Sequence, residues 1–150
     1  MKDTHPYPPF VPDGAVRLII GSIPPHRFCV RGALYPDDVD FYYGSRVNGF
    51  WKLVGEACGA GFTFRNTEEA VLERKNFLAS ARTGITDIID RCGRVNGGSS
   101  DSDLTDIGFR DPSDLLRAYP DIREIVCTST FVKRCLGSAL GIRFRAVPEE

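Results

Sequence analysis

Three short apolar runs lie along the chain, and polar residues or glycines bound each of them. They cover residues 16–20, 85–89 and 124–128. A nearly continuous apolar run of this length is typical of a parallel strand that is covered on both faces. We therefore predict three buried parallel strands at these positions.

Segments with apolar residues at helical spacing alternate with these runs, and glycines or prolines mark their ends. Thr67 is a suitable N-cap for the second of them, because its hydroxyl can accept a hydrogen bond from the first helical turn. We predict four helices: 50–58, 68–81, a short helix between Asp111 and Pro120, and 131–140.

The alternation of strands and helices predicts an α/β fold. Parallel strands joined by right-handed crossovers give a three-layer α/β/α sandwich with a central, mostly parallel sheet. Prolines at positions 6, 8, 9 and 12 keep the first residues extended, so residues 1–15 are predicted to form an arm without secondary structure. Residues 16–150 are of a size typical of one domain, and the polar stretch 91–103 is predicted to be a surface loop.

Composition narrows the range of partners. The chain has 19 basic and 20 acidic residues, and its formal charge of -1 does not favour a strongly electrostatic, non-specific nucleic-acid binder. The five cysteines include no Cys-x-x-Cys pair, so we expect no metal and no cofactor. The chain shows no signal peptide and no apolar run of membrane-spanning length, so we expect a cytoplasmic monomer without a membrane partner.

Two segments have the composition of a binding site. Residues 21–25 (Gly-Ser-Ile-Pro-Pro) follow the first predicted strand, where ligands of open α/β sheets bind, and form a stiff turn. Residues 41–51 combine flat rings with hydrogen-bonding side chains, which are the groups needed to stack on a nucleobase and read its edge. Taken separately, the turn can be purely structural and the rings can be core residues.

Together the two segments resemble the uracil-DNA glycosylase superfamily. Members of that family begin with a buried strand that ends in a short Gly- and Pro-containing motif, and an aromatic residue that stacks on the base follows it. In the hypoxanthine-type and mismatch-specific branches an Asn-x-Phe-Trp run comes next, which 48–51 matches. The resemblance continues through 83–91, 98–102 and 124–136.

The resemblance implies a pocket that binds a flipped base. The resemblance makes the Gly- and Pro-containing segment 21–25, called the first motif below, the floor of this pocket. Tyr43 corresponds to the family's aromatic residue that stacks on the base. The residues expected to bind the base are Gly21, Ile23, Pro24, Tyr43 and Asp101.

The family orients the attacking water with an Asp or Asn in the first motif, but here Ile23 occupies that position. In the hypoxanthine-type branch an Asn of the aromatic segment has this role, which points to Asn48. Ser22, Asp87 and Asp101 are alternatives. Asp87 lies within a predicted strand, where a buried carboxylate needs a partner, and it is read equally well as a structural acceptor.

Contact with the DNA backbone is assigned on the same resemblance to Arg46, Ser99 and Ser129. The family ends in a fourth strand and a Ser- and Pro-rich loop that grips DNA, and residues 142–150 contain no such loop. We therefore expect the domain to lack it.

The expected function is that of a DNA glycosylase that hydrolyses the N-glycosidic bond of a deaminated or mismatched base, uracil or hypoxanthine, in base-excision repair. Its partner is DNA that contains such a base. The alternative is a non-catalytic relative that binds nucleobases or nucleic acid through the same pocket. A general nucleotide-binding protein is disfavoured, because the chain has no Gly-x-Gly-x-x-Gly and no P-loop sequence.

Overall fold

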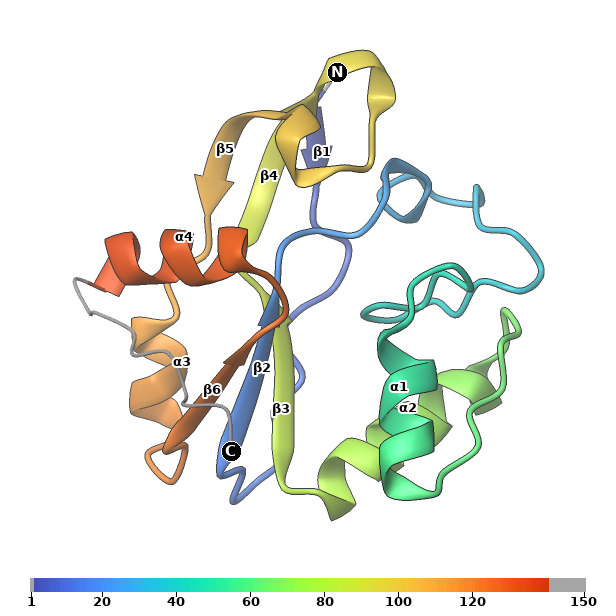
Figure 1. Ribbon diagram of the computed structural model, residues 1–150, viewed down its shortest axis with the longest axis vertical. Coiled ribbons are helices and arrows are strands. Elements are labelled where there is room, and N and C mark those ends of the chain that lie inside the picture. The colour runs from blue at the N-terminus through green and yellow to red at the C-terminus, as the bar shows by residue number, and fades with distance from the viewer. Residues whose placement is uncertain (1, 141–150) are drawn as a thin grey trace.

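The computed structural model describes residues 2–140, which form a mixed α/β fold built on two sheets (Figure 1). One sheet is parallel, with strand order β3-β2-β6: β2 (Arg17–Gly21), β3 (Thr83–Asp87) and β6 (Glu124–Cys127). The other is antiparallel, with strand order β1-β4-β5: β1 (Lys2–Thr4), β4 (Ile89–Arg94) and β5 (Leu104–Phe109). The three predicted parallel strands are confirmed, whereas the antiparallel sheet was not predicted.

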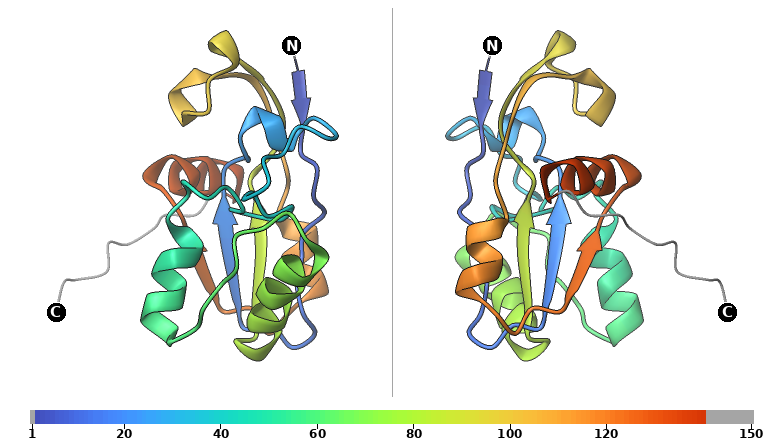
Figure 2. Two further views of the ribbon diagram at one scale, coloured as in Figure 1. Left: turned by 90° about the vertical axis from the view of Figure 1, so that its right-hand side faces the viewer. Right: turned by 90° about the vertical axis from the view of Figure 1, so that its left-hand side faces the viewer.

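Within residues 2–140 four α-helices accompany the strands, and all four were predicted. α1 and α2 lie on one side of the parallel sheet, and α3 and α4 lie on the other (Figures 1 and 2). The bounds are α1 (Phe50–Cys58), α2 (Glu68–Ser80), α3 (Ser113–Ala118) and α4 (Thr130–Leu140). Short 3-10 helices cover η1 (His26–Phe28), η2 (Val95–Gly97) and η3 (Asp101–Asp103). Thr67 caps α2 as predicted, because its side chain accepts from the Ala70 N–H.

β2 is the central strand, and both of its faces are buried. Successive side chains of a strand point to opposite faces. Ile19 therefore packs in one core cluster with Trp51 of α1, while Leu18 packs in the other with Val132 of α4. This burial fixes the position of the β2 carboxyl end, from which the candidate site begins.

The N-terminal segment is part of the sheet structure, so the prediction of an arm without secondary structure is wrong for residues 2–4. β1 pairs with β4, with Lys2 opposite Gly93, and Phe10 forms a bridge with Ile85 of β3. The side chains that β1 and the next residue bury, Asp3 and His5, are polar. No alternation of apolar and polar residues marks this strand.

The prediction of a polar loop over 91–103 is correct for residues 95–103, whereas residues 91–94 belong to β4. β4 and β5 pair antiparallel, and only residues 95–103 connect them. β4 carries Asp90, Arg91 and Arg94 and buries few apolar side chains, so its composition imitates that of a loop.

None of the helices within residues 2–140 has the length and apolar character that crossing a lipid bilayer requires. The absence of a Ser- and Pro-rich loop was predicted from residues 142–150, which lie outside the described part of the chain.

Candidate active site

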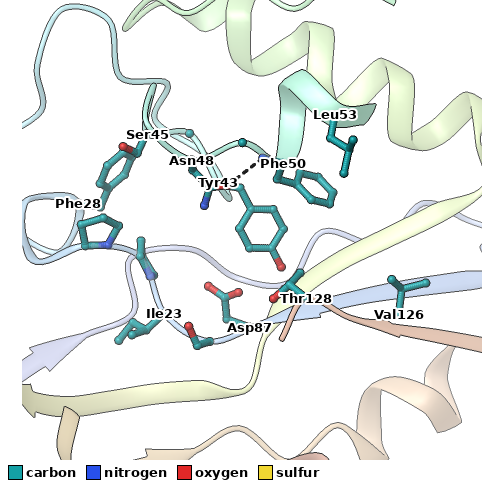
Figure 3. Close-up of a pocket in the computed structure, with 15 residues that line it drawn as sticks. Ile23, Phe28, Tyr43, Ser45, Asn48, Phe50, Leu53, Asp87, Val126 and Thr128 are labelled. Carbon is teal, nitrogen blue, oxygen red and sulfur yellow. Dashed lines mark hydrogen bonds between the residues drawn. The ribbon is translucent and has the colours of Figure 1, made fainter. Parts of the chain in front are cut away.

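A cavity of about 730 Å³ opens at the carboxyl ends of the parallel strands (Figure 3). The turn after β2, the last residue of β3 and the residues around the end of β6 form one part of its wall. The segment that leads into α1 forms the other. The lining residues are Ser22, Ile23, Pro24, Pro25, Phe28, Tyr43, Gly44, Ser45, Asn48, Gly49, Phe50, Leu53, Asp87, Val126 and Thr128.

Gly21, the last residue of β2, is in a position that no side chain can occupy. A Cβ atom there would lie 2.5 Å from Asp87 Oδ1 and 2.5 Å from the Tyr43 hydroxyl oxygen. These two groups therefore meet directly above the Gly21 backbone, and the next residues, Ser22 and Ile23, open into the cavity. The first motif is thus a place of close approach as well as a turn.

Gly21→Ala is accordingly expected to lower the free energy of unfolding by about 1–3 kcal/mol, because the added methyl group must displace Tyr43 and Asp87. Denaturant unfolding measures this loss. Gly61→Ala is the matched control, since nothing lies within 4 Å of a Cβ at that position. It should change stability by less than about 0.5 kcal/mol. Equal stability of the two variants would contradict the close approach at Gly21.

The turn after β2 is held from outside by a cluster of polar and charged side chains on β1, η1 and β4. Arg94 donates from Nη2 to the Pro24 carbonyl at 2.6 Å and from Nε to Asp3 Oδ2 at 2.7 Å. Asp3 also pairs with His26 Nδ1 at 2.8 Å. These contacts link the N-terminal strand to the floor of the cavity.

Tyr43 holds an unusual backbone conformation at the cavity wall. Its φ is +57°, a left-handed value that non-glycine residues adopt only when their surroundings compel it. The ring packs edge-on against Phe50, with centroids 4.7 Å apart, and the hydroxyl donates to the Thr86 carbonyl at 3.1 Å. Burial raises the pKa of the Tyr43 hydroxyl well above its ordinary value, and the neighbouring Asp87 carboxylate adds to the rise. The hydroxyl therefore stays protonated.

The other rings of the aromatic segment divide between core and cavity. Phe41, Tyr42 and Trp51 are buried in the core, and the Trp51 indole N–H donates to the Tyr42 carbonyl at 2.8 Å. For these three the alternative reading as core residues is correct. Tyr43 and Phe50 line the cavity.

Asn48 stands at the rim, just before α1. Its Oδ1 accepts a hydrogen bond from the Phe50 N–H at 3.0 Å, which serves one of the free donors at the start of the helix. This bond fixes the amide orientation, and in Figure 3 the Nδ2 group points into the cavity. Asn48 can thus donate a hydrogen bond to a water or to the edge of a bound ring.

Asp87 ends β3 at the floor of the cavity, and its partner is a residue that the sequence did not indicate. His5 Nε2 lies 2.6 Å from Asp87 Oδ2, and both side chains are almost completely buried. His5 Nδ1 accepts from the Tyr7 backbone N–H at 3.1 Å. The only sequence signal for His5 is that the chain contains just two histidines.

Five of the predicted site residues do not line the cavity. They are Gly21, which lies beneath Tyr43 and Asp87, and Arg46, Ser99, Asp101 and Ser129. Arg46 is exposed and pairs with Asp37 at 3.0 Å. Ser129 Oγ accepts from the Val132 N–H at the start of α4. Asp101 lies in η3, between β4 and β5, so this geometry gives no support to its predicted contact with the base. Ser99 is an exposed residue of the same connection.

The cavity also has lining residues that were not predicted, among them Phe28, Ser45, Phe50 and Thr128. Thr128 is the last residue of the third predicted strand, at a carboxyl end where ligands of open α/β sheets bind, so its position was one where a site was expected. Phe28 lies in η1 with no pattern around it to suggest a site.

The cavity wall combines flat apolar surface with a few hydrogen-bonding groups. Tyr43, Phe28 and Phe50 provide rings, while Asn48 and Asp87 provide an amide and a carboxylate. Such a wall suits a planar heterocycle with polar edges, and the amide and carboxylate are able to hold a water beside it.

Comparison with known proteins agrees with this chemistry. No family model matches the chain. The chain is 30% identical over 120 residues to the hypoxanthine DNA glycosylase of Methanosarcina acetivorans, and this match covers 79% of the chain and 66% of that relative, just under two thirds of its length. The solution NMR structure of a proposed uracil DNA glycosylase from Methanosarcina acetivorans superposes with a TM-score of 0.69 at 25% identity, covering 99% of this chain and 84% of that one. The chain belongs to the uracil-DNA glycosylase superfamily.

Proposed function

We propose that this protein is a monofunctional DNA glycosylase that removes a deaminated or mismatched base, hypoxanthine or uracil, in the first step of base-excision repair. One observation carries the proposal: a single cavity at the carboxyl edge of the sheet brings Tyr43, Asn48 and Asp87 together. The names of the two similar proteins support hypoxanthine and uracil as the bases to test first.

The nucleotide must leave the DNA stack before its glycosidic bond can be reached. In the proposal the flipped base enters the cavity against Tyr43, whose hydroxyl is already engaged with Thr86 and whose ring is braced by Phe50. The floor is the turn of Ile23 and Pro24, and Ser22, which lines the same cavity, is proposed to read a polar edge of the base.

Asn48 is proposed to orient the water that attacks the sugar. Its Oδ1 is tied to the backbone of α1, so the Nδ2 group keeps one direction without further cost in side-chain entropy. Ile23 lines the same cavity and its side chain has no polar atom, so this position of the first motif cannot supply this function.

Contact with the DNA backbone is proposed for Arg46, Ser99 and Ser129. Arg46 is the exposed cation among them, and its ion pair with Asp37 is at the surface, where such pairs contribute little. A phosphate group can replace Asp37 as its partner.

A non-catalytic role is the second candidate, and Ile23 is the observation that favours it. Its alkyl side chain occupies the position where the family resemblance implies an Asp or Asn that orients the water. A protein of this kind would bind a duplex that contains the altered base without cleaving the glycosidic bond.

The deciding experiment uses labelled duplexes that carry hypoxanthine, uracil or a G·T mismatch, with enzyme in excess and alkaline cleavage at abasic sites as the readout. We expect strand breaks with at least one of the altered duplexes and none with the unaltered duplex. Binding of an altered duplex without any strand break would favour the non-catalytic role and contradict the glycosylase.

A further inference from the structure

His5 and Asp87 form a buried pair whose protonation follows from its hydrogen bonds. A backbone N–H can only donate, so His5 Nδ1, which accepts from the Tyr7 N–H, carries no proton. The ring proton is therefore on Nε2, and Nε2 donates it to Asp87 Oδ2 at 2.6 Å. His5 is a neutral donor, and the pair has the charge of the carboxylate alone.

The second carboxylate oxygen, Oδ1, is left without a donor. It is buried and has no hydrogen-bond partner among the described residues. The Tyr43 hydroxyl lies beside it and hydrogen-bonds to the Thr86 carbonyl at 3.1 Å. A buried polar atom without a hydrogen-bond partner lowers the stability of the fold. In native proteins such atoms are rare, and a catalytic role is one explanation for them.

No other charged group compensates Asp87. Within residues 2–140 the only basic side chain in contact with its carboxylate is His5, whose ring is a neutral hydrogen-bond donor. Arg110 packs against the same region, but its guanidinium donates to the Tyr7 carbonyl and the Tyr42 hydroxyl. The remaining groups that face the pair are aromatic, since the rings of Tyr42 and Tyr7 lie 5.3 and 5.8 Å from His5.

The free carboxylate lies on the cavity wall opposite Asn48. Figure 3 shows the Asp87 carboxylate and the Asn48 amide pointing into the cavity from different sides. Their chemistry is complementary toward a water molecule, because an amide N–H donates to the water oxygen and a carboxylate accepts a water hydrogen.

We propose that Asp87 is a further catalytic residue, whose Oδ1 accepts the proton of the attacking water, and that His5 is the positioning residue that orients it. This inference rests on the proposed glycosylase function. It adds to that function a proton acceptor and brings the N-terminal segment into the site.

The step balances without any other reactant. The water oxygen forms a bond to C1′ of the sugar, and the C1′–N bond to the base breaks with its electron pair going to the base nitrogen. The water proton moves to Asp87 Oδ1 and later to solvent, and the departing base takes a proton from solvent. As the bond breaks, positive charge develops on the sugar, and the uncompensated carboxylate stabilises it.

Asp87→Asn is the first test, because the variant keeps an acceptor for His5 Nε2–H and loses only the charge. We expect the single-turnover rate of base excision to fall by about 100-fold or more, with unchanged affinity for a duplex that carries a non-hydrolysable 2′-fluoro analogue of the substrate. A rate within about threefold of wild type would overturn the proposal.

His5 is tested by a pair of variants that separate orientation from packing. His5→Phe keeps a ring between Tyr7 and Tyr42 but cannot donate, whereas His5→Gln can donate to Oδ2. The rate should fall by at least about tenfold in His5→Phe and recover in His5→Gln, with duplex affinity constant in both. Equal rates for the two variants would show that His5 only fills space.

A measurement that needs no activity completes the test. The ¹⁵N NMR signals of His5 at pH 7, assigned with a His26→Gln variant that removes the other imidazole, should show a neutral ring protonated at Nε2. A doubly protonated ring would overturn the proposal even if the enzyme is active. If wild type cleaves and Asp87→Asn cleaves equally fast, only this inference fails; if wild type cleaves nothing, the proposed function fails with it.

Discussion

Asn48→Ala should lower the single-turnover rate of base excision by about 100- to 1,000-fold, while the fold remains intact. The variant removes the Nδ2 donor that points into the cavity, and the loss of one well-placed donor to a reacting group has an effect of this size. It also removes the acceptor for the Phe50 N–H, so a decrease in stability of about 0.5–1 kcal/mol is expected in addition. Rapid-quench assays with enzyme in excess measure the rate, and denaturant unfolding measures the stability.

Asn48→Asp is the matched control for this change. It retains an oxygen that accepts from the Phe50 N–H at the positive end of α1, so its stability should equal or exceed that of wild type. It lacks the amide donor, and its rate should therefore be as low as that of Asn48→Ala. An Asn48→Asp enzyme as fast as wild type would remove the amide from the mechanism.

Trp51→Ala should cause the largest loss of stability among these variants, about 4–5 kcal/mol. The side chain is fully buried in the cluster that joins α1 to the sheet, and truncation leaves a large cavity there. It also leaves the Tyr42 carbonyl without the indole N–H. Since a domain of this size is stable by about 5–15 kcal/mol, the unfolding temperature should fall by roughly 10–20 °C in a calorimetric scan.

Trp51→Phe separates the two contributions. It keeps a ring against Phe50 and Phe62 and loses the hydrogen bond, so the loss of stability should be about 1–3 kcal/mol. If Trp51→Ala unfolds within about 3 °C of wild type, the α1 segment is not anchored by this side chain, and the fixed position of Asn48 loses its explanation.

The elements that could be predicted from the sequence are those whose buried positions are apolar residues in a regular pattern. Leu18, Ile19 and Ile20 form a continuous apolar run because β2 is covered on both faces, and the periodic faces of α1 and α4 are read in the same way. β1 and β4 could not be predicted from such a pattern. Asp3 and Arg94, which join them, are polar residues that satisfy each other across 91 positions, and local periodicity contains no information on such a contact.

The residues of the candidate site likewise include some that a local sequence pattern indicates and some that depend on contacts between distant segments. Tyr43 and Asn48 were predicted because they lie in one segment with a recognisable order, and the structure places both on the cavity wall. His5 was missed because its partner Asp87 is 82 positions away and no motif joins them. Asp87 itself was named, but only the structure shows that one of its oxygens has no donor.

The pairing of β1 with β4 has a consequence for how the protein is made. Residues 2–4 are synthesised before residues 91–93, with which they pair, so β1 must wait for them before it can join the sheet. At about 5–20 residues per second, this delay is on the order of ten seconds. During that time the nascent chain can form β2 and α1 but holds an incomplete cavity. A prematurely released chain that ends before β4 would therefore contain Tyr43 and Asn48 without the strand that fixes His5, so the complete site forms only after β4 has been synthesised.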